Sequence, residues 1–210
     1  MQQAFKIEDS KLNIEDSPSP TMTLLDYAIN AALVLSFVAV NKQDKAGLVT
    51  FSDQFGTFVP ASRQQGQMHT LQEALYAEQT QFGETDYSAL LAGLSRHVTR
   101  RSLLILFTSF TSMAALRRQL QYLRQLATRH RLLVVFFEDE ELTQFIVEGE
   151  HSPLHRTEEY YQHVIAEKFA YEQRLIVQTL RQYGIQSLLT TPNNLSVDVI
   201  NKYLEIKARS

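Results

Sequence analysis

The residues best placed for chemistry lie where a buried strand is expected to end. Residues 103–107 (LLILF) are five consecutive apolar residues, a length typical of a buried strand rather than a helix. Thr108 and Ser109 follow directly, and ligands of parallel α/β sheets bind at the carboxyl ends of strands. An acidic residue here would predict a metal or catalytic site, whereas Ser109 offers a neutral hydroxyl.

A second group of polar residues, Thr85 and Asp86 in "GETDY", stands at the start of a helix expected over 85–97. A Thr at this point commonly caps free N–H groups, and an Asp in the first turn suits the positive end of the helix dipole. Both residues are therefore explained without a ligand, and Ser109 is explained as an ordinary loop hydroxyl.

Other chemistries have weaker support. His151, His155 and His163 invite a zinc site, but Pro153 interrupts the helical spacing of the first two, and no HExxH motif occurs. The chain has no cysteine. It has no P-loop or GxGxxG motif and no G-x-S-x-G elbow. An unrecognised hydrolase stays open as the third hypothesis.

Charge is distributed unevenly, although the net charge of −3 shows no overall bias toward nucleic acid or membrane. Residues 96–131 contain eight arginines and no acid, whereas 138–172 contain ten acids and two basic residues. The arginines are Arg96, Arg100, Arg101, Arg117, Arg118, Arg124, Arg129 and Arg131. Three explanations of this charge distribution are open. We rank first a solvated surface on which the two sections neutralise each other, second a binding surface for an acidic protein partner, and third a binding surface for nucleic acid.

The elements that must position these residues alternate between apolar strands and helices. Strands are expected at 46–52, 55–60, 103–108, 132–137 and 185–191, and helices at 23–41, 68–79, 85–97, 113–130, 155–183 and 196–208. The first two strands form a hairpin. This order predicts a doubly wound, mostly parallel α/β sheet with an antiparallel edge strand. We expect strands 46–51, 103–108, 132–137 and 186–190 to share this sheet, with the first three parallel.

The sequence predicts where one helix begins and where another ends. Thr23 is a plausible N-cap for the helix at 23–41, and Gly184 suits the end of the long helix. The first helix is apolar nearly all round, so we expect it to be covered on every side. Its longest apolar run, 31–40, is too short to span a bilayer.

The first twenty residues differ from the rest. They are polar and acidic, they contain "IEDS" twice, and they do not look like a signal peptide. We expect residues 1–21 to be poorly ordered or degenerate, although "AFKI" at 4–7 could form a short strand. A cytoplasmic location is expected, either in solution or at the membrane surface within a longer protein.

Five stretches resemble a known family in order and spacing. They are "TLLDYAINAALVLSFVAVNKQDKAGLVTFSD", "ETDYSALL", "RRSLLILFTSF", "HRLLVVFFEDEEL" and "YGIQSLLTTPNNLSVDVINKYLEIKARS". Together they resemble the von Willebrand factor A-like domain of the bacterial domain of unknown function 58 family. The resemblance covers residues 22–210 and implies a Rossmann-like fold whose first strand is truncated or degenerate. It also implies a binding and scaffolding domain rather than an enzyme, with a MoxR-type AAA+ ATPase as protein partner.

The resemblance further implies a metal-ion-dependent adhesion site for Mg²⁺. Such a site uses an Asp-x-Ser-x-Ser loop, a Thr and a further Asp. Thr85 matches the Thr, but Ser109 stands at the Asp position. Asp9 is the nearest match in the first loop, where Lys11 and Asn13 replace the serines. We therefore expect a degenerate, unoccupied site and no cofactor.

These observations favour a metal-free, non-enzymatic protein-interaction domain that binds no nucleic acid. Its candidate partner-binding residues are Thr85, Asp86, Ser109, Arg117 and Arg124. The alternative is a Mg²⁺-dependent adhesion module completed by Asp9 and Thr85. Arginines 117, 124 and 131 recur every seven residues, which predicts one exposed face, while Leu116, Leu120, Leu123 and Ala127 take the core side.

Overall fold

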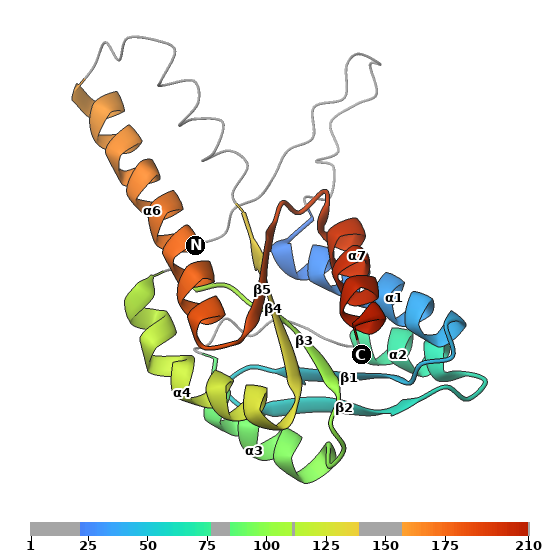
Figure 1. Ribbon diagram of the computed structural model, residues 1–210. Coiled ribbons are helices and arrows are strands. Elements are labelled where there is room, and N and C mark those ends of the chain that lie inside the picture. Colours follow the sequence, from blue (N-terminus) through green and yellow to red (C-terminus); the bar gives the residue numbers. More distant parts are fainter. Residues whose placement is uncertain (1–21, 77–84, 111, 139–156, 210) are drawn as a thin grey trace, which may run out of the picture.

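The computed structural model describes residues 22–76, 85–110, 112–138 and 157–209 (Figure 1). Its helices are α1 (Leu24–Asn41), α2 (Gln67–Tyr76), α3 (Tyr87–His97), α4 (Met113–Arg129), α6 (Thr157–Gln182) and α7 (Leu195–Ala208). Its strands are β1 (Ala46–Phe51), β2 (Phe55–Ser62), β3 (Leu103–Phe107), β4 (Arg131–Phe137) and β5 (Gln186–Thr190). The expectations for residues 1–21, His151 and His155 lie outside these ranges.

The structure confirms the predicted N-terminal cap of α1 and the predicted C-terminal end of α6. Thr23 caps α1 in a capping box with Asp26, in which each side chain bonds the backbone N–H of the other residue. After α6, Gly184 adopts a φ of +74°, a left-handed conformation that glycine reaches without steric cost. The predicted hairpin is also present, with β1 and β2 antiparallel.

The strands of the described residues form two sheets rather than one. In the first sheet, β3, β4 and β5 run parallel in that order, and in the second β1 pairs with β2, its one partner within the part of the chain that the structure describes. The prediction that 46–51 shares the parallel sheet is therefore wrong, whereas the pairing of 103–107, 131–137 and 186–190 is confirmed. A hairpin closes through its own short turn, so β1 finds β2 locally, and α1, α2 and α3 pack on the hairpin and supply the burial that two strands alone lack.

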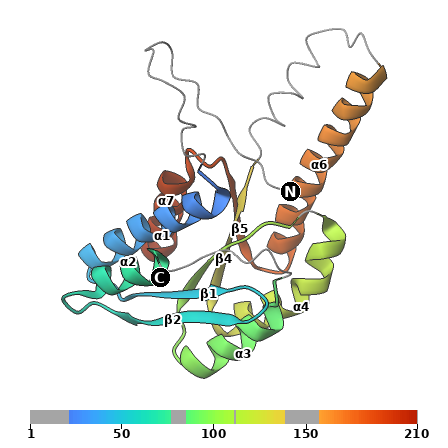
Figure 2. The same ribbon diagram turned by 180° about the vertical axis from the view of Figure 1, so that it is seen from behind.

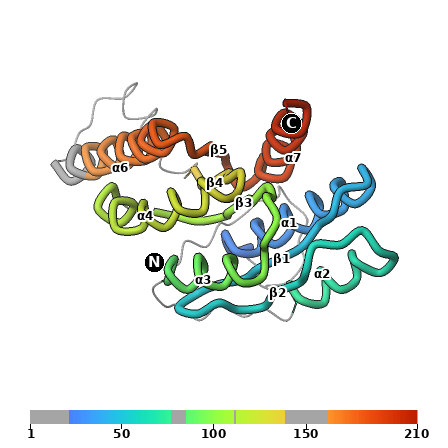
Figure 3. Tube along the Cα trace, turned by 60° about the horizontal axis from the view of Figure 1, so that its bottom comes forward, coloured from blue at the N-terminus to red at the C-terminus, as the bar shows by residue number. Residues whose placement is uncertain are grey.

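Helices cover the parallel sheet on both faces, which makes the molecule a mixed α/β structure. Figures 1 and 2 show α4 and α6 on one side of the sheet, and α1 and α7 on the other. Side chains of β4 alternate between these layers: Val134 and Phe136 pack among α4 and α6, while Leu133 and Val135 pack among α1 and α7. Figure 3 shows α3 beside the hairpin, on the side away from α7.

Helix α1 is less covered than its composition predicts. Only Ala31 and Ala39 are buried, while Val34 and Phe37 are 43% and 56% exposed. The expectation of cover on every side is wrong, because α1 packs mainly against α7 and α2 and leaves one apolar face open. By length and composition alone α1 could also cross a membrane, although core helices of soluble proteins can meet the same criterion.

Candidate functional site

The carboxyl end of β3 and the start of α3 are joined by one hydrogen bond. The hydroxyl groups of Tyr87 and Thr108 lie 2.5 Å apart, which brings the segments carrying Thr85 and Ser109 side by side. Tyr87 is buried and packs edge-on against Phe51. Burial raises the pKa of the Tyr87 phenol to about 12, so it stays protonated at physiological pH.

Asp86 fills the capping role that the sequence suggested for Thr85. Its carboxylate accepts the backbone N–H groups of Ser88 and Ala89 at 2.7 and 3.2 Å. Its own N–H donates to the carbonyl of Ser52 at 2.7 Å, which ties α3 to the end of β1. Asp86 is thus the N-cap, and the expected cap at Thr85 is wrong. Thr85 is exposed and precedes the helix.

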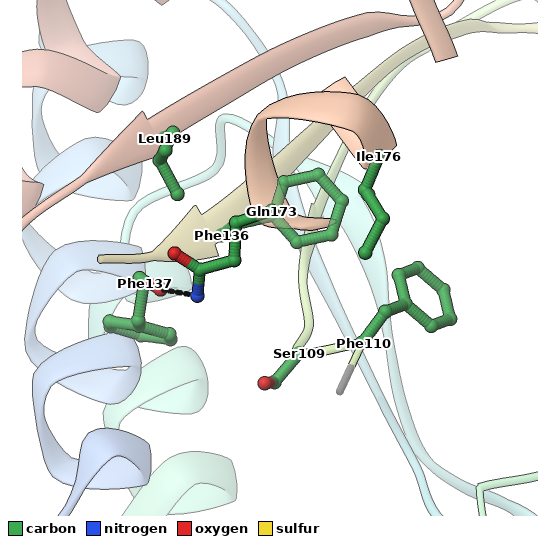
Figure 4. Close-up of a pocket in the computed structure, with 7 residues that line it drawn as sticks. All are labelled: Ser109, Phe110, Phe136, Phe137, Gln173, Ile176 and Leu189. Atoms are coloured by element: carbon green, nitrogen blue, oxygen red, sulfur yellow. Dashed lines mark hydrogen bonds between the residues drawn. The ribbon is translucent and has the colours of Figure 1, made fainter. Parts of the chain in front are cut away.

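Ser109 is exposed at the carboxyl end of β3, beside a small cavity (Figure 4). The cavity is lined by Ser109, Phe110, Phe136, Phe137, Gln173, Ile176 and Leu189. Its volume of about 10 Å³ is the room that one water molecule needs, so it holds no organic substrate. The side-chain amide of Gln173 donates to the Phe137 carbonyl at 3.3 Å and closes one side.

The candidate metal residues are not gathered into a complete ligand set in the part of the chain described. No three His, Cys, Asp or Glu residues lie together there, and Asp9 falls outside it. Thr85 and Ser109 contribute hydroxyl oxygens, while the Asp86 carboxylate already accepts two N–H groups. Neutral hydroxyls alone are poor ligands for a hard cation, which prefers carboxylates and carbonyls.

The arginines of α4 form a separate exposed surface. Ser112 caps the helix, and Leu116, Leu123 and Leu126 are buried against the core. Arg117, Arg118 and Arg124 are exposed on the opposite side, and we call these three the α4 arginine face. Their placement confirms the amphipathic pattern expected for 113–130.

Two other arginines are anchored by hydrogen bonds. The Arg129 guanidinium donates to the Ser95 hydroxyl at 3.0 Å. Arg131 is not on the helix, because it begins β4 and donates to the Ile206 carbonyl at 3.2 Å. The predicted seven-residue stripe therefore ends at Arg124, since α4 stops at Arg129.

The α4 arginine face takes part in none of the ion pairs found among the described residues. The guanidinium of Arg124 instead lies 4.8 Å from the centre of the Tyr183 ring, a cation–π contact. Glu172 of α6 lies near α4, but its carboxylate accepts the backbone N–H of Met113. Most acids of 138–172 lie outside the described side chains, so neutralisation by them stays a prediction.

One polar cluster gave no signal in the sequence. Tyr203 of α7 donates a hydrogen bond to Asp44 before β1, and the Lys207 ammonium lies 2.6 Å from the same carboxylate. The partners are more than 150 residues apart in the chain, and neither the periodicity nor a short motif relates them. Their contact positions α7 against the hairpin rather than forming an open site.

These features define a mixed α/β domain whose polar strand ends carry a small cavity and whose α4 carries a basic face. The family model described as "Protein of unknown function DUF58" matches residues 15–150, more than half of the chain. The chain therefore belongs to the DUF58 family. No curated protein shows significant sequence similarity to it.

Proposed function

We propose that this chain is a non-enzymatic protein-binding domain that docks an acidic protein surface on its α4 arginine face. The observation that carries the proposal is that Arg117, Arg118 and Arg124 are exposed and belong to no ion pair in the described part of the chain. Guanidinium groups bind carboxylates in a bidentate manner, and complementary charge accelerates association.

Two structural features support α4 as a docking element. Its core side is fixed by fully buried leucines, Leu116 and Leu123, so the helix presents its other side without rearrangement. Arg124 rests over the Tyr183 ring, which restricts its side chain and reduces the entropy lost on binding.

The proposed partner is a MoxR-type AAA+ ATPase in the cytoplasm, and the proposed fold is that of a von Willebrand factor A-like domain. Both rest on the resemblance described above, together with the mixed α/β architecture. Cytoplasmic exposure, in solution or at the membrane surface, would allow an ATPase to reach the α4 arginine face.

The test is association with a purified MoxR-type AAA+ ATPase, measured at low and moderate salt. The variant Arg117→Glu/Arg124→Glu reverses two exposed charges and should slow association by about tenfold or more and flatten its salt dependence. A matched control, Lys45→Glu/Arg63→Glu, reverses two exposed charges near the hairpin. The proposal fails if both variants slow association equally, or if neither does.

A second candidate function is a Mg²⁺-dependent adhesion module using Asp9 and Thr85. It is favoured by the bond between Tyr87 and Thr108, which sets the Thr85 and Ser109 segments side by side. In that case partner binding would require Mg²⁺ and would be lost in Thr85→Ala, while the α4 variant would bind normally. The two functions therefore differ in metal dependence as well as in the surface used.

A further inference from the structure

Strand β5 lies at the edge of the parallel sheet, and β4 is its neighbour there. The Thr190 carbonyl accepts the N–H of Glu138, which follows β4, so Thr190 and Leu188 direct their backbone groups to β4. Ser187 and Leu189 direct theirs to the other edge. Within the described ranges no backbone hydrogen bond reaches that edge.

The sequence of β5 does not protect this edge. Its five residues, QSLLT, contain no charge, proline or glycine, and their register with β4 is regular from Gln186 to Thr190. Edge strands normally carry charges, prolines or bulges that prevent a further strand from adding to them. The edge of β5 is therefore chemically competent to accept another extended chain.

A groove lies beside the amino end of β5, and we call it the β5 groove. Its volume is about 280 Å³, and its lining residues are Arg181, Gly184, Ile185, Gln186, Ser187 and Lys202. Arg181 belongs to the last turn of α6, and Lys202 belongs to α7. Because α6 and α7 cover opposite faces of the sheet (Figures 1 and 2), these two cations flank the groove from both sides.

The β5 groove is basic, since its lining contains two cations and no acid. Arg181 is exposed and has no ion pair in the part of the chain described. Lys202 pairs with Glu205 at 2.8 Å, but Glu205 also pairs with Arg209 at 2.9 Å, so one carboxylate serves two cations. The helix dipole explains a basic residue in the last turn of α6, but it does not explain why Lys202 of another helix lines the same groove.

Gln186 adds an unpaired polar atom to the lining. Its side-chain Oε1 is buried, and no described residue donates a hydrogen bond to it. A buried acceptor without a donor costs free energy, whereas the neighbouring Ser187 hydroxyl donates to the Val177 carbonyl at 3.3 Å. A peptide offers N–H groups for Gln186 together with carboxylates for the two cations.

We propose that β5 and the β5 groove bind an extended acidic segment of a partner protein, which adds to the sheet as a further strand. The backbone of this segment pairs with the outward N–H and C=O groups of Ser187 and Leu189. Neighbouring side chains of a strand point to opposite faces, so two successive acidic residues reach Arg181 on the α6 side and Lys202 on the α7 side. The site is separate from the α4 arginine face and does not depend on it.

Charge complementarity favours this occupant over two others. A second copy that pairs through its own β5 brings the segment QSLLT, which has no carboxylate for Arg181 or Lys202. A small free anion satisfies the cations but leaves the strand edge unused. An extended segment with acidic residues uses the cations and the strand edge together.

Amide hydrogen exchange of the full chain tests the proposal. The probe is a peptide with blocked ends, Ser-Thr-Val-Asp-Glu-Val-Thr-Ser. It should slow exchange at Ser187 and Leu189 by at least about tenfold more than at Leu188, which already bonds β4 in the free chain. A neutral control peptide with Asn-Gln in place of Asp-Glu should bind at least about fivefold more weakly. A second control with proline in place of both valines should not bind, because proline cannot donate to a ladder.

Charge variants locate the bound peptide. Arg181→Gln should weaken binding of the acidic peptide by at least about fivefold, whereas Arg63→Gln, exposed at the end of the hairpin, should not. Binding that persists in Arg181→Gln but is lost in Arg117→Glu/Arg124→Glu would place the peptide on the α4 arginine face. That result would overturn this proposal and would support the proposed function.

The remaining outcomes identify other occupants, and each would overturn the proposal. Protection of Ser187 and Leu189 in the free chain would mean that the edge is already occupied, by a second copy if the protection rises with protein concentration. Equal slowing of these amides by free glutarate would make a small anion the ligand. Equal binding of the neutral peptide, or no binding of the acidic peptide at millimolar concentration, would remove the acidic segment as the occupant.

Discussion

His130 is a buried histidine whose protonation opposes folding. It is 3% exposed at the end of α4, and its Nδ1 accepts the backbone N–H of Ser102 at 3.4 Å. Burial, with the charge of Arg129 as a smaller cause, lowers the pKa of His130. A neutral imidazole at this place is therefore part of the folded structure.

The lowered pKa makes a pH-dependent stability prediction. The unfolded chain protonates His130 near pH 6.5, while the folded chain binds that proton only at lower pH. The His130 contribution to the free energy of unfolding is therefore intact above about pH 6.5 and lost as the pH falls toward the folded pKa. Urea unfolding at pH 7.5 and 5.5 should show a smaller difference in His130→Gln than in the unaltered chain. The exposed control His69→Gln should keep the full difference.

Also at the scale of single residues, the neutral hydroxyls of Thr85 and Ser109 predict negligible affinity for Mg²⁺. We expect no micromolar heat signal in isothermal titration, because neutral ligands give a hard cation too little charge. Ser109→Asp alone should not create binding, since Lys11 still stands in the candidate first loop. A micromolar site that disappears in Thr85→Ala but persists in the control Thr99→Ala would contradict this prediction.

At the scale of elements, the α4 arginine face should be dispensable for folding. Arg117 is exposed outside any described ion pair, so its reversal removes little favourable energy. Arg124 also loses its contact with Tyr183, so Arg117→Glu/Arg124→Glu should cost about 1 kcal/mol in the free energy of unfolding. A melting curve measures this, and a loss of several kcal/mol would mean that the arginines are structural.

The open face of α1 makes a second element-scale prediction. Phe37→Gln should change the free energy of unfolding by less than about 0.5 kcal/mol, because Phe37 is 56% exposed. Leu35→Gln should cost about 1–3 kcal/mol, since Leu35 packs in two clusters. Chemical denaturation compares the two variants. Equal losses would show that the face bearing Phe37 is covered in solution.

At the scale of the whole molecule, the hydrogen bond between Tyr203 and Asp44 joins α7, the last helix, to the segment between α1 and β1. Tyr203→Phe removes the hydrogen bond to Asp44 and should lower the free energy of unfolding by about 1 kcal/mol. The exposed control Tyr76→Phe should change it by less than about 0.5 kcal/mol. Denaturation followed by circular dichroism measures both. Equal effects would mean that this contact does not stabilise the fold.

The sequence by itself determined the local elements. Apolar runs and periodicity located β3, β4 and α4 to within one or two residues, while Thr23 and Gly184 marked helix ends. The two-residue link also predicted the hairpin. These features succeed because caps, turns and helical periodicity depend on residues that are close along the chain.

The tertiary structure alone decided which surfaces are used. It separated β1 from β3, left Phe37 of α1 exposed, and made Asp86 rather than Thr85 the cap of α3. Arg131, expected on the face of the basic helix, instead begins β4. Strand pairing and burial depend on segments that are far apart in the sequence. Apolar composition indicates only that a residue can be buried. Which partner covers it is decided when the layers pack.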